Sequence, residues 1–306
     1  MKKLLFSLTL LIGILVLSSC SNQECAYTHE SVVYETLEQS KQLEDLCSKI
    51  ETYNQTLPSL DTRGKKKWKW WQWAILGASD AIGGAAAGLF GGVSASAVVA
   101  TAWAAEVDQI VVKVEVEKGG SHPIPYYTGV IIDNNDFKNN YADSIGYIHN
   151  RALVELCSDS TKVQEFCAID SNGKITMITN TLNMVNNTNS FNQSSAEEKN
   201  SAFDKAELIR KIANTADDLN DFISLLHENS SILGVTNSEI DVYEKYFTGL
   251  ANAIETGDNG NYLNDILHFT DQSNLSSNIK RKIGNVIILA NASFRLWYNS
   301  SFGDRN

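Results

Sequence analysis

The chain has 306 residues, with 36 acidic against 25 basic side chains and a formal net charge of −11. This acidic balance argues against a protein that binds nucleic acid or another polyanion through charge. The length, together with a hydrophobic content of 43%, is sufficient for a globular domain with its own core.

The N-terminal residues 1–19 have the pattern of a secretory signal peptide. Lys2 and Lys3 precede an apolar stretch over residues 4–17, and the small residues Ser18 and Ser19 follow. The stretch is shorter than the roughly 20 apolar residues that a transmembrane helix needs. Removal of residues 1–19 is therefore favoured over their retention as an anchor helix.

Four residues at the end of this stretch, Leu17, Ser18, Ser19 and Cys20, resemble the bacterial lipobox. The resemblance implies a cell-envelope lipoprotein whose partner is a membrane, reached through lipidated Cys20, with palmitate among the acyl chains. Ser21 stands where an inner-membrane retention signal has aspartate, which implies an outer membrane lipoprotein, in either leaflet. Loss of residues 1–19 removes two lysines, so 36 acidic against 23 basic residues leave a net charge of −13.

Four cysteines remain beside the lipidated one: Cys25, Cys47, Cys157 and Cys167. An even number in an oxidising compartment permits two disulfides. Pairing between sequence neighbours, Cys25 with Cys47 and Cys157 with Cys167, is favoured, although all three connectivities are open on sequence alone. The spacings do not match a zinc site, so we expect no metal and no other cofactor.

Residues 20–61 are predicted to form a helical segment next to the lipid anchor, because a loosely helical pattern covers residues 30–50. Residues 62–106 differ sharply in composition and form a second unit, described in the next paragraph. Residues 107–142 are predicted to be a loop or short strands, since apolar and charged residues alternate over residues 110–117 before a Gly- and Pro-containing loop.

Small residues recur at every fourth position of the second unit, which places them on one slowly turning helix face. A face without bulk lets another helix approach closely, in lipid or within a protein. This pattern is a glycine zipper, and it predicts membrane interaction, self-association or another form of helix packing. Its members are Gly84, Gly88, Gly92, Ser96, Ala100 and Ala104.

No charged residue occurs between Asp80 and Glu106, and five of the six tryptophans border this stretch. In a single helix, Trp73 and Trp103 would lie about 45 Å apart, the thickness of a bilayer with its headgroups. We predict an interfacial position for the tryptophans, helped by the basic residues of the 63–69 segment. They are Trp68, Trp70, Trp71, Trp73 and Trp103.

Two interpretations of the zipper segment are open. Membrane interaction, by spanning, insertion on demand or oligomerisation, is favoured, and the segment resembles glycine-zipper segments of bacteriocin-like and other membrane-active peptides. The alternative is a buried Ala/Gly hairpin inside the soluble domain of a binding or structural lipoprotein.

Residues 143–306 are predicted to form a helical domain of about five helices. Asp143 is the expected N-cap of the first helix, and an Asn-rich linker over residues 180–192 follows it. One seam runs over residues 209–226, a second helix over residues 240–254 begins at the cap Ser238, and shorter helices cover 262–269 and 279–297. The fold class is therefore mainly α, a helical bundle preceded by an Ala/Gly-rich glycine-zipper helix or hairpin.

The first of these helices carries a D-x-x-G-x-x-H-N-x-x-L box formed by Asp143, Gly146, His149, Asn150 and Leu153. It resembles a box of uncharacterised Bacteroidota envelope lipoproteins, and the resemblance implies no activity. On a helix, the last four residues share one face, which favours a structural role for His149 and Asn150.

The weaker alternative makes His149 a general base that Asp143 or Glu155 orients. Motifs for a nucleophile elbow, a phosphate-binding loop and an EF-hand do not occur in the sequence. We therefore expect a protein that is not an enzyme, and the sequence does not indicate a small-molecule partner.

Overall fold

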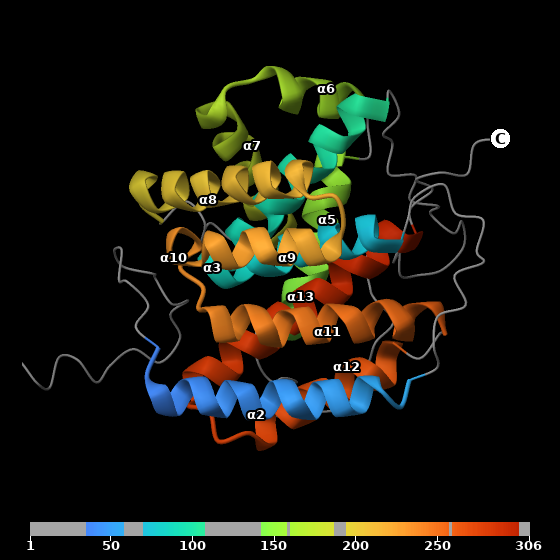
Figure 1. Cartoon of the computed structure of the whole chain (residues 1–306). Helices are drawn as coiled ribbons and strands as arrows, with labels where there is room; N and C mark the ends of the chain where they lie inside the picture. Colours follow the sequence, from blue (N-terminus) through green and yellow to red (C-terminus); the bar gives the residue numbers. More distant parts are fainter. Residues whose placement is uncertain are drawn as a thin grey trace, which may run out of the picture.

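A computed structural model of the chain describes residues 35–57, 70–107, 142–157, 160–186, 194–256 and 259–299 (Figure 1). These residues contain eleven helices and no strand, which confirms the mainly α prediction. The predicted signal peptide, Cys20, Cys25, Trp68 and most of the predicted loop or strand region lie outside the described residues.

The helices near the two ends of the chain are α2 (Leu37–Asn54), α11 (Asn237–Glu255), α12 (Asn259–Gln272) and α13 (Ser277–Asn299). Those between them are α3 (Trp70–Val107), α5 (Ala142–Cys157), α6 (Ser160–Ala168), α7 (Ser171–Asn186), α8 (Ala196–Thr215), α9 (Leu219–Glu228) and α10 (Ser230–Leu233).

Helix α3 is a hairpin of two antiparallel legs. The backbone leaves the helical region at Ala87 (φ −155°, ψ 29°) and Gly88 (φ 62°, ψ −156°). Glycine adopts a positive φ without the steric cost that other residues incur, so the chain can reverse at Gly88. The prediction that the six zipper residues lie on one face of one helix is therefore wrong, because the fourth-residue repeat continues across this break.

The two legs contact each other through glycine. A Cβ atom placed on Gly83 would lie 2.5 Å from the carbonyl oxygen of Gly91 and 2.7 Å from the Cβ of Ala95. Side chains larger than hydrogen at Gly83 would therefore push the legs apart. The zipper glycines Gly84 and Gly92 instead face α13, since a Cβ on either would meet Leu289 Cδ2, at 2.5 and 2.6 Å.

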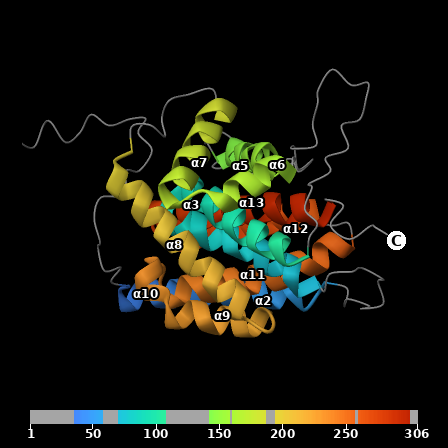
Figure 2. The same ribbon diagram turned by 90° about the horizontal axis from the view of Figure 1, so that it is seen from above.

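The hairpin lies in the middle of the bundle. It packs most extensively against α8 and α13, and also against α5. Figure 2 shows α3 and α13 between a layer of α5, α6 and α7 on one side and a layer of α2, α9 and α11 on the other. Ala74–Ala102 is the one described stretch whose length and composition would let it cross a membrane, but most of it is buried, as in the core helix of a soluble protein.

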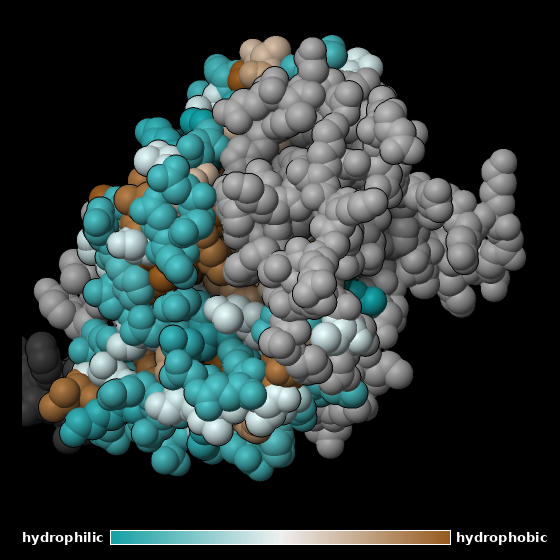
Figure 3. All heavy atoms as spheres, turned by 45° about the vertical axis from the view of Figure 1, so that its right-hand side comes forward, coloured by the Kyte–Doolittle hydropathy of each residue, from teal (hydrophilic) through white to brown (hydrophobic). Residues whose placement is uncertain are grey.

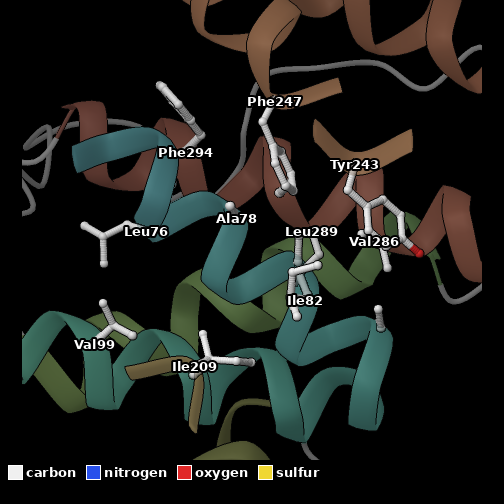
Figure 4. Close-up of a cluster of buried hydrophobic side chains, with 14 of the residues drawn as sticks. Leu76, Ala78, Ile82, Val99, Ile209, Tyr243, Phe247, Val286, Leu289 and Phe294 are labelled. Carbon is white, nitrogen blue, oxygen red and sulfur yellow. The ribbon is translucent and has the colours of Figure 1, made fainter. Parts of the chain in front are cut away.

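The core around the hairpin is apolar and continuous. Figure 4 shows Ile82 of the first leg beside Leu289 of α13, with Phe247 of α11 reaching toward them. All three side chains are at most 1% exposed. The described part of the surface in Figure 3 is largely hydrophilic. Among the described residues, the exposed large apolar side chains are Leu37, Met184 and Ile232.

Four predictions about helix boundaries are wrong. The seam over residues 209–226 is interrupted, because α8 ends at Thr215 and Asp218 caps α9 by accepting a hydrogen bond from the Asp221 amide. Residues 180–186 of the predicted Asn-rich linker belong to α7, whose face of Ile178, Leu182 and Val185 is buried, and residues 187–192 lie outside the description. Burial of this face outweighs the low helix propensity of asparagine.

The other two corrections concern helix starts. Helix α5 begins at Ala142, so Asp143 lies inside its first turn and is not the N-cap. At α11 the cap is Thr236, not Ser238, because the Thr236 hydroxyl accepts from the Glu239 amide at 3.2 Å. Glu239 Oε2 in return accepts from the Thr236 amide at 3.0 Å, which completes a capping box.

Replacement of Thr236 by alanine should lower the free energy of unfolding by about 1 kcal/mol, since the first turn of α11 loses its side-chain acceptor. Urea unfolding measures the change. Thr236→Ser is the matched control, because it keeps the hydroxyl and should retain most of the stability. Equal losses in the two variants would show that the cap contributes nothing.

Candidate functional site

The first leg of the hairpin carries a carboxylate into the core. Asp80 is 0% exposed, and its Oδ2 accepts hydrogen bonds from Ser96 on the second leg, at 2.9 Å, and from Ser293 on α13. Trp297 Nε1 of α13 donates to the Ser96 hydroxyl at 3.3 Å. These bonds join both legs of the hairpin to α13 in the centre of the molecule.

Helix α5 adds the histidine box to the same place. His149 is 0% exposed, and its Nε2 lies 3.5 Å from Asp80 Oδ2. Its Nδ1 is 3.0 Å from Asn150 Oδ1, and Asn150 Nδ2 donates to the Ala292 carbonyl oxygen at 3.0 Å. We call this set the Asp80 cluster; its members are Asp80, Ser96, His149, Asn150, Ser293 and Trp297.

The remaining box residues explain how α5 approaches α13 so closely. A Cβ on Gly146 would lie 2.7 Å from the Cβ of Ala292, so this crossing requires glycine. Leu153 is 0% exposed, as are His149 and the neighbouring Ala152. The shared inward face that the sequence predicted for Gly146, His149, Asn150 and Leu153 is therefore present, and it packs against α13 and the hairpin.

Burial controls the charges of the cluster. It raises the pKa of Asp80 well above its usual value, although the hydrogen bonds from Ser293 and Ser96 act in the opposite direction. Burial lowers the pKa of His149 from 6.5 to about 4, with a smaller opposing effect of its hydrogen bond to Asn150. Both shifts favour the uncharged forms, so burial acts against an ion pair between His149 Nε2 and Asp80 Oδ2, which lie 3.5 Å apart.

The cluster contains serine, histidine and aspartate, but not in the arrangement of a nucleophilic triad. In such a triad the serine bonds to the histidine that removes its proton. Here Ser96 and Ser293 both donate to Asp80. Glu155, one of the two predicted orienting groups, contacts Lys162 at 3.5 Å, while the side chain of Asp143 lies outside the description.

Sequence reasoning missed Asp80 as a partner of His149. It identified Asp80 only as the charged boundary of the apolar stretch. The sequence contained one signal: Asp80 lies inside the helical pattern, and the small residue Ser96 follows sixteen positions later. A hairpin at Gly88 brings these two residues together. The partner residues on α5 and α13 have no sequence signal that links them to Asp80.

The tryptophans take a different arrangement from the one predicted for a single helix. Trp70, Trp71 and Trp73 lie at the start of the first leg, and Trp103 lies near the end of the second. Because the legs are antiparallel, all four belong to the open end of the hairpin. Of the other zipper residues, Ser96 and Ala100 are buried, while the side chain of Ala104 lies outside the description.

The predicted disulfide between Cys157 and Cys167 is not formed, since both are free thiols. Cys157 is 1% exposed and belongs to the core, whereas Cys167 is exposed to solvent. Burial raises the pKa of Cys157 to about 12, which keeps its thiol protonated and unreactive. Cys47 is half-buried, and its predicted partner Cys25 lies outside the described residues.

Within the described residues, no group of three or more His, Cys, Asp or Glu side chains is placed to hold a metal ion. Comparison of the chain with protein-family models, curated proteins and solved structures finds no match.

Proposed function

We propose that the chain is a lipid-anchored protein of the bacterial cell envelope, whose glycine zipper associates helices within the chain. Its function in this proposal is binding or structural, carried out by the helical domain that the lipid on Cys20 holds at a membrane. The residues of the histidine box then have a packing role and not a catalytic one.

The observation that carries this proposal is the position of the hairpin. A zipper that served association between chains would present its small residues to the outside. Gly84 and Gly92 instead approach Leu289 of the same chain, and Gly83 approaches Gly91 across the hairpin. The close contacts that small residues permit are thus already used inside one chain.

The Asp80 cluster supports the same view. It connects the hairpin to α13 through Ser293 and Trp297, and α5 to α13 through Asn150. Asp80 Oδ1 and His149 Nε2 have no hydrogen-bond partner among the described residues, but the buried hydrogen bonds that are formed favour the one arrangement of the surrounding helices that permits them. The cluster therefore fixes how the hairpin, α5 and α13 meet.

Two measurements test the proposal. The chain that lacks residues 1–19 and carries Cys20→Ser should be a monomer in buffer without detergent, by sedimentation or light scattering. An oligomer that forms only in detergent would contradict an intramolecular zipper. In cells, the full-length chain should incorporate labelled palmitate and sediment with membranes, and Cys20→Ser should abolish both; a labelled Cys20→Ser variant would contradict the lipid anchor.

A further inference from the structure

We propose that the α3 hairpin is also a unit for conditional membrane insertion. On an anionic bilayer it would leave the bundle and enter the hydrocarbon layer with the Ala87–Gly88 tip first. This activity goes beyond the proposed function, which requires only the folded, tethered bundle.

The hairpin has internal contacts that do not depend on the bundle. Gly83 and Gly91 bring the backbones of the legs into contact, and the Ser96 hydroxyl donates to Asp80 from the opposite leg at 2.9 Å. Inside a bilayer a polar group needs a partner within its own structure. Asp80 would lose Ser293 on leaving the bundle but would keep Ser96, because that partner moves with it.

The legs have a length and a mostly apolar composition that suit a hairpin inserted from one side of a bilayer. The first covers residues 70–86 and the second residues 89–107. At 1.5 Å per residue they extend about 25 and 28 Å with their interfacial tryptophans included, so the hairpin would enter the roughly 30 Å hydrocarbon layer from one side without crossing it fully. Residues 81–105 carry no charge, so the tip and nearly the whole second leg contain no ionised group.

The tip of the hairpin is uncharged, whereas aromatic and basic residues gather at its open end, as insertion from one side of a bilayer requires. Four tryptophans belong to the open end, where a bilayer interface accepts aromatic side chains. Arg63, Lys65, Lys66, Lys67 and Lys69 directly precede it in the sequence, and anionic headgroups attract such a basic run. A soluble core hairpin has no need for this segregation of aromatic and basic residues to one end.

The tip is accessible in the folded bundle. Gly88 is half-buried, and a Cβ placed there would meet no atom within 4 Å. The neighbouring Ala86 carbonyl oxygen accepts from Lys205 Nζ of α8 at 3.5 Å, a long hydrogen bond to a flexible side chain. The uncharged tip could therefore contact a membrane before the rest of the hairpin moves.

A removable cross-link between the hairpin and α13 tests the proposal. A Cβ on Gly77 would lie 3.4 Å from the Cβ of Phe294, just below the disulfide range of about 3.5–4.5 Å, so a small shift allows the bond. The variant Gly77→Cys/Phe294→Cys is made in the full chain without residues 1–19, with Cys20→Ser and the four other native cysteines replaced by alanine. Release of a dye from vesicles of phosphatidylglycerol and phosphatidylcholine is the readout.

The reduced variant should release the dye at least ten times faster than the oxidised one, because the disulfide holds the first leg on α13. Phe294→Cys alone controls for the missing ring and should release dye equally with and without oxidant. Equal rates for the oxidised and reduced double variant, or no release from either, would overturn the proposal.

A second pair of variants does not depend on disulfide formation. Ala87→Asp places a charge on the tip that must cross the bilayer, and Ala87→Asn is its neutral match in size. We expect dye release at least ten times slower for Ala87→Asp than for Ala87→Asn, and equal rates would overturn insertion by the tip. A soluble monomer that never permeabilises vesicles would refute insertion while leaving the proposed function intact.

Discussion

Replacement of Gly83 by alanine should lower the free energy of unfolding by about 1–3 kcal/mol, although alanine is the better helix former. The added Cβ would lie 2.5 Å from the Gly91 carbonyl oxygen and 2.7 Å from the Ala95 Cβ. One of these obstacles is backbone, which cannot rotate away. The legs must therefore separate, and the contacts of both legs with α8 and α13 are disturbed at the same time. Urea unfolding followed by circular dichroism measures the loss.

The matched control for this substitution is Gly77→Ala in the same leg. Its Cβ would lie 3.4 Å from the Phe294 Cβ, an ordinary van der Waals contact. The variant should keep its stability or gain up to about 1 kcal/mol from helix propensity. If Gly83→Ala and Gly77→Ala change the stability equally, the two legs do not meet at Gly83 and the hairpin geometry is wrong.

The second large effect concerns pH and the pair formed by Asp80 and His149. The pKa of His149 is about 4 in the folded chain against 6.5 for the free group, so the unfolded chain binds this proton first as the pH falls. Uncharged His149 therefore makes its full contribution to the free energy of unfolding above pH 6.5, and this contribution is lost as the pH falls toward 4. Asp80 acts in the opposite direction, because its pKa is raised and the folded chain binds its proton first.

Replacement of Asp80 by asparagine removes this opposing effect and leaves His149 alone. Between pH 6.5 and 4, the Asp80→Asn variant should lose about 3 kcal/mol through His149, whereas the native chain should lose less. Urea unfolding across this range gives both curves. The double variant Asp80→Asn/His149→Gln is the control, since it should lack the additional slope. Parallel curves for the native chain and Asp80→Asn would contradict the opposite effects of the two pKa shifts.

The helical character of the chain could be predicted from the spacing of its apolar residues, but the reversal within α3 could not. Gly88 is a member of the fourth-residue repeat, so the repeat continues in register through the break. A single helix and a hairpin therefore have the same sequence pattern. The choice between them depends on contacts that the repeat does not specify, namely those between the legs at Gly83 and Gly91 and those of the legs with α8 and α13, which follow much later in the chain.

Only the part of the candidate site that lies on one helix could be predicted from the sequence. Local helical spacing was enough to place Gly146, His149 and Asn150 on one inward face. It could not supply the partners on the other side of that face, because Asp80 and Ser293 are separated by 213 residues. Helix α7 was not predicted because its asparagines, including Asn180 and Asn183, are typical of a linker, and its apolar residues were given less weight than the asparagines.

The central claim is that the zipper segment is a hairpin within one chain, and the distance between its ends tests it most directly. Spin labels at Gln72 and Ala102 of the unlipidated chain, in buffer without detergent, allow this distance to be measured by pulsed electron paramagnetic resonance. Antiparallel legs at the usual helix spacing of about 10 Å predict a label separation below roughly 25 Å. A separation near 45 Å, the length of a continuous helix of 30 residues, would contradict the hairpin.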